Sequence, residues 1–92
     1  MIKSFGCDKT EAVFNNEHVK GFPTSIIRPA HRKLLRLHVA PSLNYLSVPA
    51  ANRLEKLRGD FAGYWSIRIN DQYRIVFRWD GDAHNVKIVD YH

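Results

Sequence analysis

The sequence predicts an α+β fold in which two N-terminal helices pack on one face of a small antiparallel sheet. Apolar residues recur at helical spacing in the first half of the chain, whereas from residue 64 onward they alternate with polar ones, which is the period of a strand. Short polar turns separate the strand segments, and short connections make antiparallel hairpins. At 92 residues the chain is expected to form a single domain, 1–92, with one core.

The first half is expected to contain a short strand and the two helices. Residues 2–5 are apolar enough for a short N-terminal strand, and Asp8 with Glu11 has the spacing of a capping box for a short helix ending at 15–16. A longer helix is expected over 25–38, and residues 41–49 are expected to be loop. The apolar stripe of the longer helix, which Leu35 widens, consists of Ile27, Ala30, Leu34, Leu37 and His38.

The same helix carries basic residues on one face. Arg28, Arg32 and Arg36 lie at i, i+4 and i+8 and therefore point in similar directions. This pattern fits either an ordinary solvated face or a stripe that contacts RNA, and both alternatives stay open at this point.

Three strands are expected, over 64–69, 73–79 and 85–91, as a C-terminal meander. If Ile67 is to share the buried face with Ile75, the first hairpin needs a three-residue loop; Phe77 opposite Val86 requires a four-residue loop, 80–83. The predicted buried face consists of Trp65, Ile67, Ile69, Tyr73, Ile75, Phe77, Val86 and Ile88.

The opposite face of the sheet is expected to be rich in cations. It carries Ser66, Arg68, Arg74, Val76, Arg78, Lys87, Val89 and Tyr91. Arg68 falls directly opposite Arg74, and like charges in such positions destabilise a sheet unless an anion binds between them. Arginine binds phosphate oxygens through two parallel hydrogen bonds, so this face is a candidate phosphate-binding surface.

Composition restricts the partners and the compartment. Lys and Arg exceed Asp and Glu by five, which favours a polyanion such as nucleic acid as partner. No apolar run is long enough to span a membrane, the polar start does not resemble a signal peptide, and Cys7 is the sole cysteine, so we expect a cytoplasmic protein. Metal-ligand spacing and Gly-rich phosphate loops are absent, so no cofactor is expected.

The sequence finishes with Asp90, Tyr91 and His92, directly after the third strand. A histidine beside arginines can exchange protons near neutral pH, and a tyrosine can stack on a base. RNA can be cut without metal when its 2′-hydroxyl attacks the neighbouring phosphorus. A base, an acid and a cation that stabilises the phosphoryl oxygens then suffice.

The order Ser66-Ile67-Arg68, Tyr73-Arg74-Ile75 and Asp90-Tyr91-His92 resembles the HigB-type toxins of the RelE superfamily, which are plasmid maintenance killer proteins. The resemblance spans the chain and is closest over 57–92. It implies a RelE-like fold and a toxin of a type II toxin–antitoxin module that cleaves translated mRNA in the ribosomal A site without metal.

The resemblance also implies roles and partners. Arg68 and Arg74 match the arginines at the scissile phosphate, and Asp90, Tyr91 and His92 match the catalytic residues. Arg58 stands where many relatives have lysine and can hold phosphate but exchanges protons poorly, which gives His92 more of the acid–base work. Further phosphate contacts are expected from Arg78 and Lys87.

The implied partners are a HigA-type helix-turn-helix antitoxin, the ribosome and mRNA, with operator DNA bound only through the antitoxin complex and no membrane. Two alternatives remain, namely a ParE-like non-enzymatic poison of DNA gyrase and a catalytically weak module that only binds ribosomes or RNA.

Overall fold

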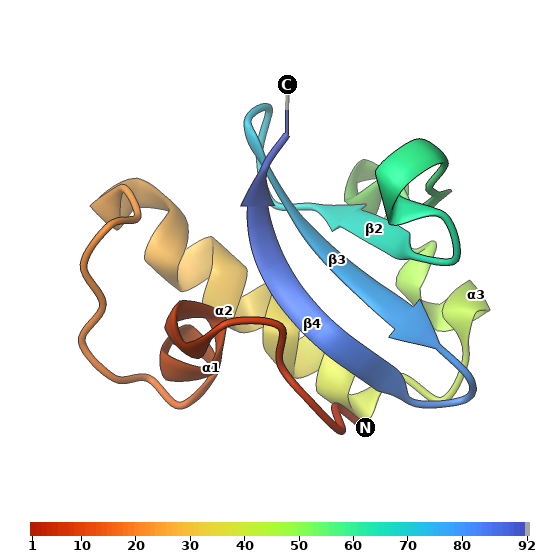
Figure 1. The fold of residues 1–92 in the computed structure, drawn as a ribbon, viewed down its shortest axis with the longest axis horizontal. Helices are drawn as coiled ribbons and strands as arrows, with labels where there is room; N and C mark the ends of the chain where they lie inside the picture. Colours follow the sequence, from red (N-terminus) through yellow and green to blue (C-terminus); the bar gives the residue numbers. More distant parts are fainter. Residues whose placement is uncertain (92) are drawn as a thin grey trace.

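The computed structural model describes residues 1–91, and within them three α-helices pack against a four-stranded antiparallel sheet (Figure 1). The strands follow chain order across the sheet, β1-β2-β3-β4. The elements are α1 (Asp8–Phe14), α2 (Thr24–Val39), α3 (Leu43–Leu46), the 3-10 turn η1 (Ala50–Asn52), β1 (Glu55–Lys56), the 3-10 turn η2 (Gly59–Phe61), β2 (Trp65–Arg68), β3 (Tyr73–Trp79) and β4 (Ala83–Asp90). The predicted α+β class is confirmed.

The core lies between α2 and one face of the sheet, and it includes Val13 of α1. The sheet contributes the fully buried side chains of Ile67, Ile75, Phe77 and Val86, together with Ile88. The stripe of α2 that meets them consists of Ile26, Ala30, Leu34 and Leu37. The predicted stripe was wrong at Leu35, which is 43% exposed. Of its other members, Ile27 is partly buried against this core and His38 is half-buried.

The first C-terminal hairpin has the predicted register. Ile67 lies opposite Ile75 and Arg68 lies opposite Arg74, which confirms the three-residue loop. The loop is fixed by Asn70, whose Oδ1 accepts the backbone amides of Gln72 at 2.9 Å and Tyr73 at 2.7 Å. Such a local side-chain bond is the reason asparagine favours turns.

The second hairpin departs from the prediction near its turn. Ile75 lies opposite Ile88 as expected, but Arg78 pairs with His84 and Trp79 with Ala83, so the register shifts by one residue between Val76 and Arg78. The shift is a β-bulge, and Asn85 within it has φ +53°. The four-residue loop 80–83 was therefore wrong, because Ala83 belongs to β4.

The predicted N-terminal strand is replaced by two isolated bridges. Ile2 pairs with Ala83 and Phe5 with Val86, both parallel to β4, so residues 2–5 run along the outer edge of this strand. The fourth strand of the sheet is instead β1, which pairs with β2 at the other edge. β1 was not predicted because its two residues both have exposed side chains and so show no strand pattern.

Two further local predictions were wrong. Asp8 is the first helical residue of α1 rather than its cap, since Cys7 occupies the N-cap position and makes no side-chain capping bond. The segment 41–49 is not all loop, because it contains α3, whose N-cap Ser42 accepts the backbone amide of Tyr45 at 3.3 Å.

The outer face of the sheet is partly covered. Ser66 and Val76 point outward by strand parity, yet both are fully buried. Leu57, from the segment that joins β1 to β2 and lies beside β2 in Figure 1, is buried as well. The outer face is therefore not an open surface, because its side chains at Ser66 and Val76 are covered.

Candidate functional site

Arg68 and Arg74 lie side by side on the outer face at one end of the β2–β3 hairpin. The ladder places them directly opposite each other, as the sequence predicted. The side chain of Arg68 is 28% exposed and that of Arg74 is 14% exposed, so Arg74 is the more enclosed of the two. Directly opposed like charges destabilise a ladder, and neighbouring groups have to compensate for them.

Three neighbours hold the guanidinium of Arg74. Its Nη1 donates to Ser66 Oγ at 3.4 Å and lies 3.7 Å from Glu55 Oε2. The guanidinium carbon also stands 4.8 Å from the centre of the Tyr91 ring, a cation–π contact. Arg68 instead forms an ion pair with the fully exposed Asp71 of the turn. Arg74 is therefore held in place, whereas Arg68 is paired with a group that can leave.

The residues after β4 reach the same end of the sheet. Asp90 lies opposite Tyr73, and its Oδ2 accepts from the Gln72 side-chain amide at 3.0 Å. The backbone amide of Tyr91 donates to Gln72 O at 2.6 Å, which fixes the chain beside the first hairpin. Tyr91 is thereby brought against Arg74. His92 lies outside the described residues.

The other predicted phosphate contacts are spread over the outer face. Arg78 is exposed and stacks over Tyr64, with its guanidinium carbon 5.2 Å from the ring centre. Lys87 is exposed on β4, opposite Val76. Arg58 is exposed at the N-terminal side of η2.

We call the group around Arg68 and Arg74, with Asp90 and Tyr91, the arginine site. Three further residues that contact it were not singled out from the sequence. Ser66 could have been found from the register, since it neighbours the Arg74 position diagonally across the hairpin. Glu55 lies on the two-residue strand β1, which has no sequence signal, and Gln72 was noted only as a turn residue.

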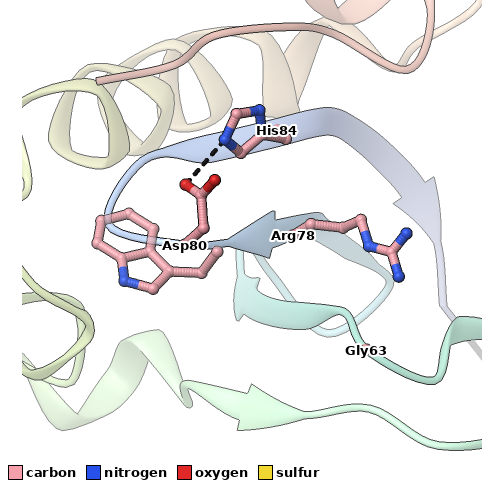
Figure 2. Close-up of a pocket in the computed structure, with 5 residues that line it drawn as sticks. Gly63, Arg78, Asp80 and His84 are labelled. Carbon is pink, nitrogen blue, oxygen red and sulfur yellow. Dashed lines mark hydrogen bonds and ion pairs between the residues drawn. The ribbon is translucent and has the colours of Figure 1, made fainter.

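A pocket of about 400 Å³ opens at the far end of the β3–β4 hairpin, lined by Gly63, Arg78, Trp79, Asp80 and His84 (Figure 2). His84 Nε2 and Asp80 Oδ1 are 2.9 Å apart. This hydrogen bond, with one from the backbone amide of Asp82, lowers the pKa of Asp80 below its ordinary value. No pattern in the sequence indicates this pocket.

The basic face of α2 is divided by the structure. Arg28 and Arg32 border a second pocket of about 430 Å³, together with Asn16, Ile27 and His31. Arg36, by contrast, donates to Val48 O at 2.9 Å and stacks over Tyr45. The three arginines therefore do not form one free stripe.

Lys33, which follows Arg32 on α2, donates to Asn52 Oδ1. Burial lowers the pKa of Lys33, and the charges of Arg36 and Arg32 lower it further. This lysine supports the contact between α2 and η1.

Within residues 1–91, no three His, Cys, Asp or Glu side chains are grouped so that they could hold a metal ion. No helix in this part of the chain is long and apolar enough to cross a membrane.

Residues 3–92 match the family model described as the RelE-like toxin of the type II toxin–antitoxin system HigB. The chain is 45% identical over 64 residues to Toxin HigB-1 of Vibrio cholerae, covering 68% of this chain and 67% of that one. It is 31% identical over 93 residues to Endoribonuclease HigB of Proteus vulgaris, and all of both chains is covered. A chain of the YoeB–YefM complex from Staphylococcus aureus has the same fold, with a TM-score of 0.55 and 20% identity over 100% of this chain and 98% of that one.

Proposed function

The chain belongs to the RelE-like HigB toxins of type II toxin–antitoxin systems, and from this premise we propose that it is a ribosome-dependent endoribonuclease that cuts mRNA in the ribosomal A site. The relative from Proteus vulgaris, which aligns over the whole chain, is named an endoribonuclease. The ParE-like alternative, a non-enzymatic gyrase poison, is not favoured by these relatives. As a toxin of this kind the protein pairs with an antitoxin.

The observation that carries the proposal is the direct pairing of Arg68 with Arg74 beside Tyr91. Two guanidinium groups on adjacent strands present a forked donor set to a phosphate, and an arriving anion relieves their mutual repulsion. Since Arg74 is already held by Ser66, Glu55 and Tyr91, its position needs little rearrangement when charge develops on the phosphoryl oxygens.

In the proposed reaction the RNA 2′-hydroxyl attacks the adjacent phosphorus. A base removes the 2′-proton while the O2′–P bond forms, the P–O5′ bond breaks, and an acid protonates the leaving 5′-oxygen. The products are a 2′,3′-cyclic phosphate and a 5′-hydroxyl. We assign the acid and base roles to Asp90, Tyr91 and His92 as a group, and charge stabilisation to Arg68 and Arg74.

The phosphates that flank the cut are assigned to three outer-face cations. Arg78 and Lys87 extend from β3 and β4, and Arg58 precedes η2. Because arginine stays protonated, Arg58 contributes binding rather than proton transfer.

The proposed partners follow from the same function. They are the ribosome and its mRNA, and an antitoxin of HigA type with a helix-turn-helix domain, through which the pair contacts operator DNA. Translation of mRNA places this activity in the cytoplasm.

The test is 5′-end mapping of mRNA in a reconstituted translation reaction. We expect new 5′ ends with the purified toxin and a loss of about 100-fold or more in cutting rate with Arg74→Ala. Arg28→Ala, which removes the same charge from exposed α2, is the matched control and should cut at nearly the normal rate.

Three outcomes would contradict the proposal. A wild-type cutting rate with Arg74→Ala would show that the arginine site is not needed for cutting. A loss of cutting rate with Arg28→Ala equal to that with Arg74→Ala would favour the basic face of α2 instead. Inhibition of purified gyrase without any RNA ends would favour the ParE-like alternative.

A further inference from the structure

Two residues of the pocket at the turn of the β3–β4 hairpin, Asp80 and His84, have no part in the function proposed above. Its volume of about 400 Å³ lies in the range of small-ligand sites. In Figure 2, Asp80 and His84 face each other on one side of the pocket, and the guanidinium of Arg78 lies on another side near Gly63. The pocket thus combines a cation, a carboxylate and an imidazole within one small opening.

The β-bulge creates this arrangement. If the register of the C-terminal part of β4 continued to its start, His84 would pair with Trp79, which points to the core side of the sheet. The extra residue, Asn85, shifts the pairing so that His84 lies opposite Arg78 on the outer face. Bulges commonly redirect a side chain in this way, and this one brings His84 to the face that carries Arg68 and Arg74.

Both charged groups of the pocket are positioned by neighbours. Arg78 stacks over Tyr64, and a Cβ on Gly63 would lie 3.0 Å from Arg78 Nη2, so a side chain at this position would push the guanidinium slightly away. The φ of Gly63 is +88°, which also favours glycine. Asp80 is held by the hydrogen bond from His84, and that bond and the one from the Asp82 amide lower the pKa of its carboxylate.

A line of cations joins the pocket to the arginine site. Arg74 and Arg78 are four residues apart on β3 and point to the same face, at a separation of about 13 Å along the strand. Lys87 lies between them on the neighbouring strand, opposite Val76, and is exposed. An RNA strand bound at Arg74 could therefore follow Lys87 to Arg78 with its phosphates on cations.

We propose that this pocket is a nucleotide subsite that receives a base flanking the cut and prefers bases with an exocyclic amino group over uracil. The inference rests on the proposed endonuclease function and deepens it. Arg78 holds the phosphate of this nucleotide, and the Asp80 carboxylate accepts from the amino group of cytosine, adenine or guanine. Uracil lacks that exocyclic donor, and its N3–H lies between two carbonyl oxygens that repel the carboxylate.

The experiment uses reporter mRNAs in the reconstituted translation reaction. The reporters differ only by cytosine or uracil at one position within three nucleotides of a mapped cut, on either side. At one of these positions we expect the wild type to cut the cytosine reporter about five- to tenfold faster. Asp80→Asn and His84→Ala should still cut the same bond, with this preference reduced below twofold.

The controls are Glu17→Gln and His18→Ala, which make the same chemical changes at exposed positions between α1 and α2. Both should keep the wild-type preference. Circular dichroism and urea unfolding test whether the pocket variants remain folded, which we expect because the side chain of Asp80 is 69% exposed and that of His84 is 34% exposed.

The outcomes separate the two proposals. Cutting by the wild type with no base preference at any of the six positions, or a preference that Asp80→Asn and His84→Ala leave intact, refutes the subsite and leaves the endonuclease standing. An absence of cuts with the wild type refutes the endonuclease, and the subsite with it.

Discussion

Removing Asp71 should strengthen RNA binding, although the substitution deletes an ion pair. Asp71 is 98% exposed and pairs with Arg68, one of the two arginines proposed to hold the scissile phosphate. RNA must displace this carboxylate before it can use Arg68. An exposed ion pair is worth about 0.2–1 kcal/mol, so Asp71→Asn should raise the affinity for RNA by about 1.4- to 5-fold.

Fluorescence anisotropy with a labelled single-stranded RNA measures this gain at several salt concentrations, and the gain should shrink as salt rises. Loss of any acidic charge also favours RNA binding, so Asp60→Asn, at an exposed position of η2, supplies the general contribution. The specific part should vanish in the Arg68→Gln background. A gain no larger than that of Asp60→Asn, or one that persists without Arg68, would refute competition between Asp71 and phosphate.

Three further predictions concern the stability of the fold. Asp80→Asn should lower the urea midpoint of unfolding at pH 7, because a carboxylate with a lowered pKa stabilises the folded state only while it is ionised. The midpoint of the variant should approach that of the wild type as the pH falls below about 4. A difference in midpoint that stays constant from pH 7 to 3 would contradict this. Phe77→Ala, at a fully buried position between α2 and the sheet, should cost about 3–5 kcal/mol of unfolding free energy, and a cost below about 1 kcal/mol would mean that the core collapses around the cavity. Asn85→Val should cost about 1–2 kcal/mol because a β-branched residue is strained at φ +53°, whereas Asn85→Gly should stay within about 0.5 kcal/mol in the same urea titration; equal stability of the two would show that the bulge is not held in this conformation.

The sequence predicted the part of the fold that depends on simple alternation. The pairing of Ile67 with Ile75 follows from which residues must be buried, and the same register places Arg68 opposite Arg74. The bulge at Asn85 could not be predicted, since its position is decided by packing of both strands rather than by a local pattern. The turn length and the outward position of His84 were missed for the same reason.

The arginine site, too, could be predicted from the sequence only in part. The cations and Tyr91 could be placed from parity, but their compensating partners could not. Glu55 reaches Arg74 from a two-residue strand, and Ser66 and Val76 are buried although they point outward. These contacts depend on how the segment before β2 folds back, which no periodicity in the sequence encodes.

The attachment of residues 2–5 to β4 has a consequence for biosynthesis. The amide of Asn85 donates to Ser4 Oγ at 2.9 Å across 81 positions of the chain, and Ile88 donates to Thr10 Oγ1 of α1 in the same manner. Helices α1 and α2 therefore emerge from the ribosome long before the strand that completes their burial. A growing chain can become a finished toxin only after residues 83–90 have been translated, so it gains its activity late in its own synthesis.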